Sequence, residues 1–345
     1  NSINGDQPIT APETLVLAFF DRVGAPADDR INGIIPLEPG TSNEITAVFV
    51  DGQGRDYQQL LQKFLLGAVA YSQGTDDYLH DDVADKGLLS VNTQDGDAPY
   101  TVLGHHWDEG FGYFGAARDY LLYTDEELAS AGGQPDWQGM HDSNGDAFID
   151  LKSEINWGAS VNCAKRDLGA QPGFETDLTA DAMNAFLAGR RLIHEAGDEL
   201  TSSEQADLLS HAEQATLAWE HAIAATVIHY INDTIADTQA IDAGGYDFYD
   251  HAKHWSEMKG FALSLQFNPK KKVTDEDLGL LHGFIGDAPV TMADSMGERQ
   301  QYIADLRSAR DLLETAYGFA NENVEGWSHG PATARRRDAG GGDAG

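Results

Sequence analysis

The chain has 345 residues, enough for two domains or one duplicated unit. Its 57 acidic residues outnumber 22 basic ones, so the net charge is −35. This charge excludes a nucleic-acid partner and suits either cation binding or a salty exterior that screens the self-repulsion. The single cysteine, Cys163, rules out an intramolecular disulfide and a cysteine-based zinc site. No apolar run is long enough for a transmembrane segment.

The N-terminal residues 1–54 are rich in Pro, Gly and Asp and predict a small irregular segment. Within it, the run "EITAVFV" predicts a strand that ends at the turn signal "DGQG". From residue 55 apolar residues recur at spacings of three and four, which predicts a first helical half over residues 55–172. The chain starts at Asn1 without a methionine, as expected for a mature exported form or a trimmed chain.

Helical spacing dominates residues 173–326, the predicted second half. One stretch, residues 203–241, is too long for an ordinary helix, so breaks are expected near Thr201–Ser203 and again later. The tail, residues 327–345, has the composition of a linker. Its arginines, Arg335 to Arg337, suggest docking on an acidic surface of this protein, of a second copy or of another surface protein. The predicted fold class is all-α, with two duplicated helical bundles.

The pattern His-Trp-x-Glu occurs twice, half a chain apart. The pairs are His106 with Glu109 and His254 with Glu257. On a helix each pair shares a face, and imidazole and carboxylate groups bind iron, zinc, copper or manganese. If the chain is duplicated, both pairs could meet at one transition-metal site. The alternative is a buried histidine that hydrogen-bonds a glutamate without metal.

Other residues are candidates for a supporting layer around such a site. This layer would orient the ligands and keep water out. The alternative interpretation is that each is an ordinary core or surface group. The candidates are Trp107, Asp108, Trp255, His229 and Asp233.

A second metal signal lies in "DSNGDAFIDLKSE", residues 142–154. Its oxygen-bearing side chains fall at positions 1, 3, 5 and 9 of a calcium loop, and the carbonyl of Phe148 falls at position 7. Two departures are Ala147, where the motif has glycine, and the final acid, which falls one residue late at Glu154. The alternative is an acidic turn before a helix. The predicted Ca²⁺ ligands are Asp142, Asn144, Asp146, Phe148, Asp150 and Glu154.

The stretch "GHHWDE" resembles the G-x-H-x-x-E signature of the imelysin-like proteins, which are exported, all-helical, duplicated bacterial proteins linked to iron uptake. More closely, "HHWDEGFGYFG", "SEINWGASVNCAKRD", "TVIHYIND" and "KHWSEMKGFALSLQFNP" resemble the bacterial family catalogued as domain of unknown function 4856. The resemblance extends from about Gly54 to Phe319. The resemblance implies a periplasmic, outer-membrane-associated or extracellular protein, with a lipid anchor as one option. It carries over His106 and Glu109 only.

Three functions remain open. The first is an exported metal-binding protein in the acquisition of iron or another transition metal, with a separate structural calcium site. The second is a calcium-stabilised cell-surface or extracellular assembly protein whose tail docks on a neighbour. The third is a metal-dependent hydrolase. No H-E-x-x-H motif is present and no substrate is indicated, so a binding role is favoured over an enzymatic one.

Overall fold

The computed structural model describes residues 11–129, 142, 144–151 and 153–328. Their regular structure is helical, and the only extended pairing in this part of the chain consists of three isolated bridges. The predicted all-α class is therefore confirmed. None of the described helices combines enough length and apolar character to cross a lipid bilayer. The duplication of the bundles stays a prediction, and the predicted tail docking concerns residues that lie almost entirely outside those described.

The described chain divides into two compact units. The first takes its residues from 11–65, 224–266 and 272–328, and the second from 66–223 and 267–271, with the gaps given above. The two copies of the His-Trp-x-Glu pattern fall in different units. One long helix, α7 (Ser202–Ala243), contributes its first half to the second unit and its second half to the first.

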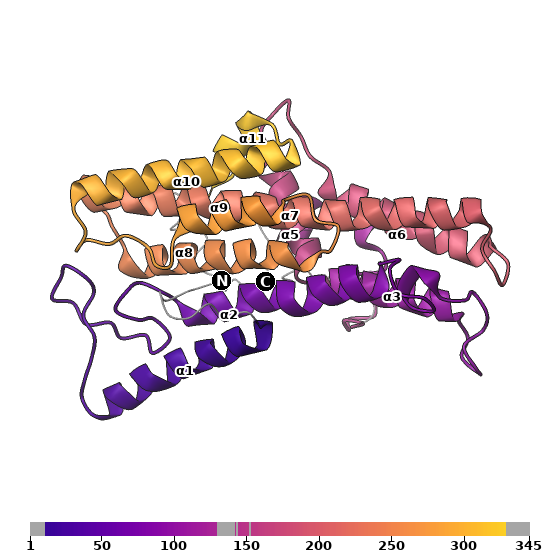
Figure 1. The fold of residues 1–345 in the computed structure, drawn as a ribbon, viewed down its shortest axis with the longest axis horizontal. Helices are drawn as coiled ribbons and strands as arrows, with labels where there is room; N and C mark the ends of the chain where they lie inside the picture. The colour runs from indigo at the N-terminus through magenta and orange to yellow at the C-terminus, as the bar shows by residue number, and fades with distance from the viewer. Residues whose placement is uncertain (1–10, 130–141, 143, 152, 329–345) are drawn as a thin grey trace. The chain divides into compact units, whose positions relative to one another are not determined.

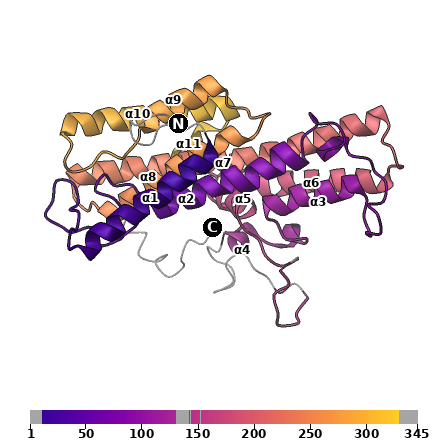
Figure 2. The same ribbon diagram turned by 60° about the horizontal axis from the view of Figure 1, so that its bottom comes forward.

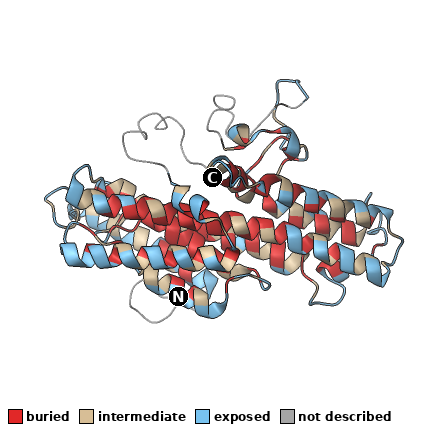
Figure 3. Cartoon of the chain, turned by 90° about the horizontal axis from the view of Figure 1, so that it is seen from above, coloured by how far each residue is buried: buried red, intermediate tan, exposed pale blue. Residues whose placement is uncertain are grey.

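In the first unit, α9 runs beside α10 and also contacts α8 (Figure 1). Helix α1 lies beside α2 (Figure 2). The ring of Phe19 on α1 contacts those of Tyr57 and Phe64. The packed faces of the helices are buried and the outer faces are exposed (Figure 3). The remaining helices of this unit are α1 (Pro12–Ile31), α2 (Tyr57–Leu65), α8 (Phe248–Ser264), α9 (Asp275–Ile285), α10 (Met296–Tyr317) and α11 (Asn321–Gly326).

The second unit contains the other motif helix, α3. It begins at the cap Thr101 and ends at Gly115, which has φ of 87°. Two consecutive π-helical turns, η1 and η2, precede it, and η2 packs on α3. Besides the first half of α7, the helical elements of the second unit are η1 (Leu66–Tyr71), η2 (Gln73–Tyr78), η3 (Gly87–Leu89), α3 (Val102–Phe114), η4 (Tyr120–Leu122), α4 (Asp125–Leu128), α5 (Ala159–Leu168) and α6 (Leu178–Glu195). The short turn η5 (Leu265–Phe267) ends at the division between the units.

Two N-terminal predictions are wrong. The segment predicted as irregular contains the 20-residue helix α1, which starts with a proline at its first turn and buries Leu15 and Phe19 on one face. The run "EITAVFV" is not a strand. It buries Ile45 and Val50 against Phe248 and makes only isolated bridges, because no neighbouring strand exists in the described chain to pair with it.

The long helical pattern starts a helix at Ser202, as predicted, but the expected later break is absent. Helix α7 continues for 42 residues. The physical reason is its composition, because no glycine or proline occurs between Ser202 and Ala243 and six alanines lie between positions 212 and 225. Gly244 and Gly245, both at positive φ, follow its end.

Candidate functional site

The second copy of the motif lies on α8 in the first unit. This helix starts at Asp247, whose carboxylate accepts hydrogen bonds from the amides of Tyr249 and Asp250. Because His254 and Glu257 are one helical turn apart, they share a face. Both side chains are buried, and Glu257 has no exposed surface.

A matching polar face lies on the second half of α7. His229, Asp233 and Asp237 follow one another at intervals of four residues and are all buried. The Nδ1 atom of His254 lies 2.7 Å from Oδ2 of Asp237, and the Nε2 atom of His229 lies 3.5 Å from Oδ2 of Asp233. We call these five residues, His229, Asp233, Asp237, His254 and Glu257, the α7–α8 cluster.

Helix α2 supplies a buried cation beside this cluster. The Nζ atom of Lys63 lies 3.4 Å from Oε1 of Glu257 and 5.9 Å from the ring centroid of Phe261. A methyl group at Gly260 would lie 2.7 Å from Cβ of Lys63, so the glycine allows α2 and α8 to approach closely. Neither carboxylate oxygen of Glu257 accepts a hydrogen bond in the described structure.

The carboxylates of the cluster favour the charged form of His254. Burial alone would lower the pKa of His254, but the hydrogen bond to Asp237 and the charges of Asp237, Asp233 and Glu257 together raise it. Asp56, at the start of α2, is also buried, and burial raises its pKa to about 6, with a smaller contribution from the charge of Glu257. The cluster therefore favours a positive charge at its centre.

The first copy of the motif has different surroundings. His106, on α3, lies with Nδ1 2.7 Å from Oγ of Ser90, and its ring centroid is 6.0 Å from that of Tyr78. The Oε1 atom of Glu109 lies 3.6 Å from Nε2 of His105, and Glu109 is 36% exposed. This pair is half-buried at the surface of the second unit.

Both motif tryptophans are buried in the core of their units. The indole of Trp107 donates to the carbonyl of Phe186 on α6, at 3.0 Å, and that of Trp255 donates to the carbonyl of Ile285 on α9, at 3.4 Å. Each motif copy thus has its own buried tryptophan, which donates a hydrogen bond to the backbone of another helix. Asp108 points elsewhere, because its carboxylate accepts from Nε of Arg190 at 2.8 Å.

The predicted four-residue site is untested, because its two halves lie in different units. In the described part of the chain, no three His, Cys, Asp or Glu side chains are arranged to hold a metal ion as they stand. Two predicted supporting residues, His229 and Asp233, do lie in the α7–α8 cluster with His254. Sequence reasoning missed Asp237, although it continues their four-residue spacing. It also missed Lys63, for which no local signal exists.

The predicted calcium loop is folded around Asp142. Its carboxylate accepts hydrogen bonds from the amides of Gly145, Asp146 and Ala147, at 2.7 to 3.1 Å. Ala147 has φ of 67° at the position where the motif has glycine. The remaining predicted ligands are hydrogen-bonded locally: Asn144 accepts from the amide of Asp146, Asp146 from that of Phe148, and Glu154 from that of Asp150. Residues 143 and 152 lie outside the described chain.

The fold and these side chains define an all-helical protein with a buried histidine–carboxylate cluster in one unit. Within that class, residues 13–155 match the family model described as Domain of unknown function (DUF4856). The resemblance to this family is therefore confirmed for that part of the chain, while the link to the imelysin-like proteins stays a prediction. No curated protein and no solved structure significantly matches the chain.

Proposed function

We propose that this protein binds a divalent transition-metal cation at the α7–α8 cluster. The observation that carries the proposal is Glu257, which is fully buried while neither of its oxygens accepts a hydrogen bond. A desolvated carboxylate costs several kcal/mol unless its charge is balanced by close partners. Lys63 at 3.4 Å supplies part of this balance, and a bound cation would supply more.

The chemistry of the cluster suits a metal of borderline softness. Imidazole together with carboxylate is a ligand set for zinc, iron or manganese. Metal binding requires a neutral imidazole, so a cation would compete with the protonation of His254, which the neighbouring carboxylates favour. Since no three side chains now converge, binding involves a change of rotamer within the cluster.

The role that we propose for this site is acquisition of a transition metal by an exported protein. The net charge of −35 supports it, because an acidic surface raises the local concentration of cations. The proposal differs from the sequence-based site in one respect. It needs only the second motif copy, with Asp233 and Asp237 in place of His106 and Glu109.

The test is elemental analysis of natively purified protein, repeated on variants after reloading with Zn²⁺, Mn²⁺ or Fe²⁺. We expect Asp237→Asn and His254→Gln to lose metal per chain. Asp242→Asn is the matched control, because Asp242 lies on the same helix but pairs with Arg299 outside the cluster. The proposal fails if wild type neither contains nor takes up metal, or if Asp237→Asn is less stable but keeps full metal content.

We also propose a structural Ca²⁺ in the loop 142–154. The specific support is Ala147, because a non-glycine residue held at positive φ costs about 1 kcal/mol or more. The conformation orients three amides toward Asp142 and matches the turn that calcium loops make at their sixth position. This site is compatible with either the metal-acquisition role or a calcium-stabilised surface protein.

A further inference from the structure

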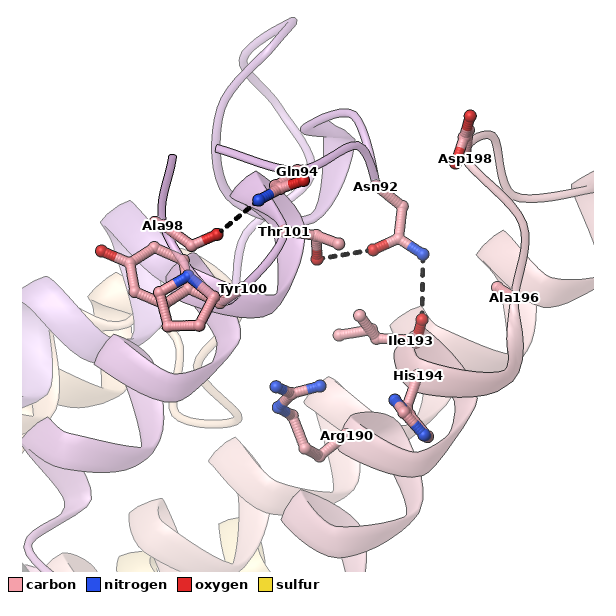
Figure 4. Close-up of a pocket in the computed structure, with 11 residues that line it drawn as sticks. Asn92, Gln94, Ala98, Tyr100, Thr101, Arg190, Ile193, His194, Ala196 and Asp198 are labelled. Atoms are coloured by element: carbon pink, nitrogen blue, oxygen red, sulfur yellow. Dashed lines mark hydrogen bonds between the residues drawn. The ribbon is translucent and has the colours of Figure 1, made fainter. Parts of the chain in front are cut away.

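A cavity of about 370 Å³ lies in the second unit, between the start of α3 and the last turns of α6 (Figure 4). This volume is in the range of small-molecule sites. One wall is formed by Arg190, Ile193 and His194, which share a face of α6. The opposite wall is formed by the segment that leads into α3, including Tyr100 and Thr101.

The guanidinium of Arg190 points into this cavity (Figure 4). Its Nε atom donates to Asp108 at 2.8 Å, which fixes the orientation of the group from one side. No described residue accepts a hydrogen bond from its two Nη atoms, so that edge is available to a ligand. A methyl group at Gly104 would lie 3.6 Å from Cζ of Arg190 and 2.9 Å from Oγ1 of Thr101, so the glycine keeps this wall open.

The cavity wall holds one permanent cation in a chain of net charge −35. This cation is Arg190, and the one carboxylate of the lining, Asp198, lies at the far edge from it (Figure 4). The first amides of α3 do not contribute, because they donate to Thr93, Val91 and Thr101. Arginine is therefore the anion-binding group here.

We propose that this cavity binds a small molecule that carries a carboxylate group. The two free Nη atoms of Arg190 form a fork that matches the two oxygens of a carboxylate. Polar neighbours, namely the Tyr100 hydroxyl and the amide of Gln94, suit hydroxyl groups on the rest of the ligand. The half-exposed ring of Tyr100, held against His105 at a centroid distance of 4.6 Å, offers an apolar face to its carbon skeleton.

The test is isothermal titration of the full chain with galacturonate, citrate, galactose and inorganic phosphate. Galacturonate and galactose differ by the carboxylate, so we expect saturable binding of the first and of citrate, but not of galactose. Arg190→Gln should weaken this binding about tenfold or more. Arg191→Gln is the matched control, because Arg191 is the next residue on α6 and is exposed outside the cavity.

Circular dichroism checks that the variants fold, and little loss is expected because the Arg190–Asp108 pair is exposed. Should Arg190→Gln fail to fold, Arg190→Lys keeps the charge but not the fork and should also bind more weakly. Any of four results overturns the proposal. They are equal binding by Arg190→Gln and wild type, equal binding of galactose and galacturonate, binding of phosphate alone, and no binding of either carboxylate at millimolar concentration.

Discussion

The Nδ1 atom of His254 lies 2.7 Å from Oδ2 of Asp237, on a helix face that also carries Asp233. The equivalent atom of His106 lies 2.7 Å from the hydroxyl of Ser90 instead. One sequence pattern thus occurs once beside buried carboxylates and once beside a neutral group. A carboxylate partner makes an imidazole a stronger metal ligand than a neutral hydroxyl does, so changes at His254 and His106 are expected to differ in their effect on metal content.

Removing one member of the buried pair Lys63–Glu257 should destabilise the fold strongly. We expect Glu257→Gln to cost about 3–5 kcal/mol, because the ammonium of Lys63 would remain buried beside a neutral amide. The double variant Lys63→Met/Glu257→Leu should cost much less than the sum of the single changes, since no charge stays buried. Urea unfolding with a chelator present measures this, and additive losses would contradict it.

His251 should make the protein sensitive to acid. Burial lowers its pKa from 6.5 to about 4, outweighing the nearby charge of Asp237. A histidine with a lower pKa in the folded state binds its proton better when the protein is unfolded. The free energy of unfolding therefore decreases as the pH falls from 6.5 towards 4. The decrease linked to His251 is about 3 kcal/mol.

The measurement compares wild type with His251→Gln, which is neutral throughout. Urea midpoints at pH 7.5 and 4.5 should fall less in the variant than in wild type. The other acidic groups titrate in both proteins. Only the difference between the decrease in wild type and the decrease in the variant therefore reports on His251. Equal decreases in the two proteins would mean that His251 binds its proton equally well in the folded and the unfolded state, which would contradict the prediction.

Two glycines in the second unit should respond oppositely to alanine. A methyl group at Gly189 on α6 would overlap the ring of Trp107, so Gly189→Ala should cost about 1–3 kcal/mol. Gly112 on α3 is exposed and has no atom near the same position, so Gly112→Ala should stabilise the helix by about 0.5–1 kcal/mol. Thermal unfolding of both variants tests the packing of α3 on α6, and a neutral Gly189→Ala would refute it.

Calcium should raise the melting temperature through the loop 142–154. We expect wild type to melt higher in Ca²⁺ than in chelator, and Asp142→Asn/Asp146→Asn to melt equally in both. The reason is that a cation bound to the folded state alone stabilises it by mass action. Asp95 and Asp97 lie in another exposed acidic loop, so Asp95→Asn/Asp97→Asn is the matched control. If wild type itself melts identically in the two conditions, the loop is an acidic turn without calcium.

The helical class and several helix starts could be predicted because their signals are local. Apolar residues at helical spacing, as at Leu60 and Phe64, place one face of α2 in the core. The absence of glycine and proline from Ser202 to Ala243 could have predicted one continuous helix. Helix α1 was missed because its buried face has only Leu15 and Phe19, in a segment whose composition is typical of loops.

The sequence by itself determined the helical period, the repeated motif and the acidic charge, because each depends on neighbouring residues or on composition. Only the tertiary structure decided which motif copy is buried and what faces it. Lys63 meets Glu257, and Asp237 meets His254, because the faces of α2, α7 and α8 pack together. That packing depends on the summed shape of many side chains and on close approaches such as Gly260 against Lys63. No spacing along the chain records which helix will supply the partner of a buried charge.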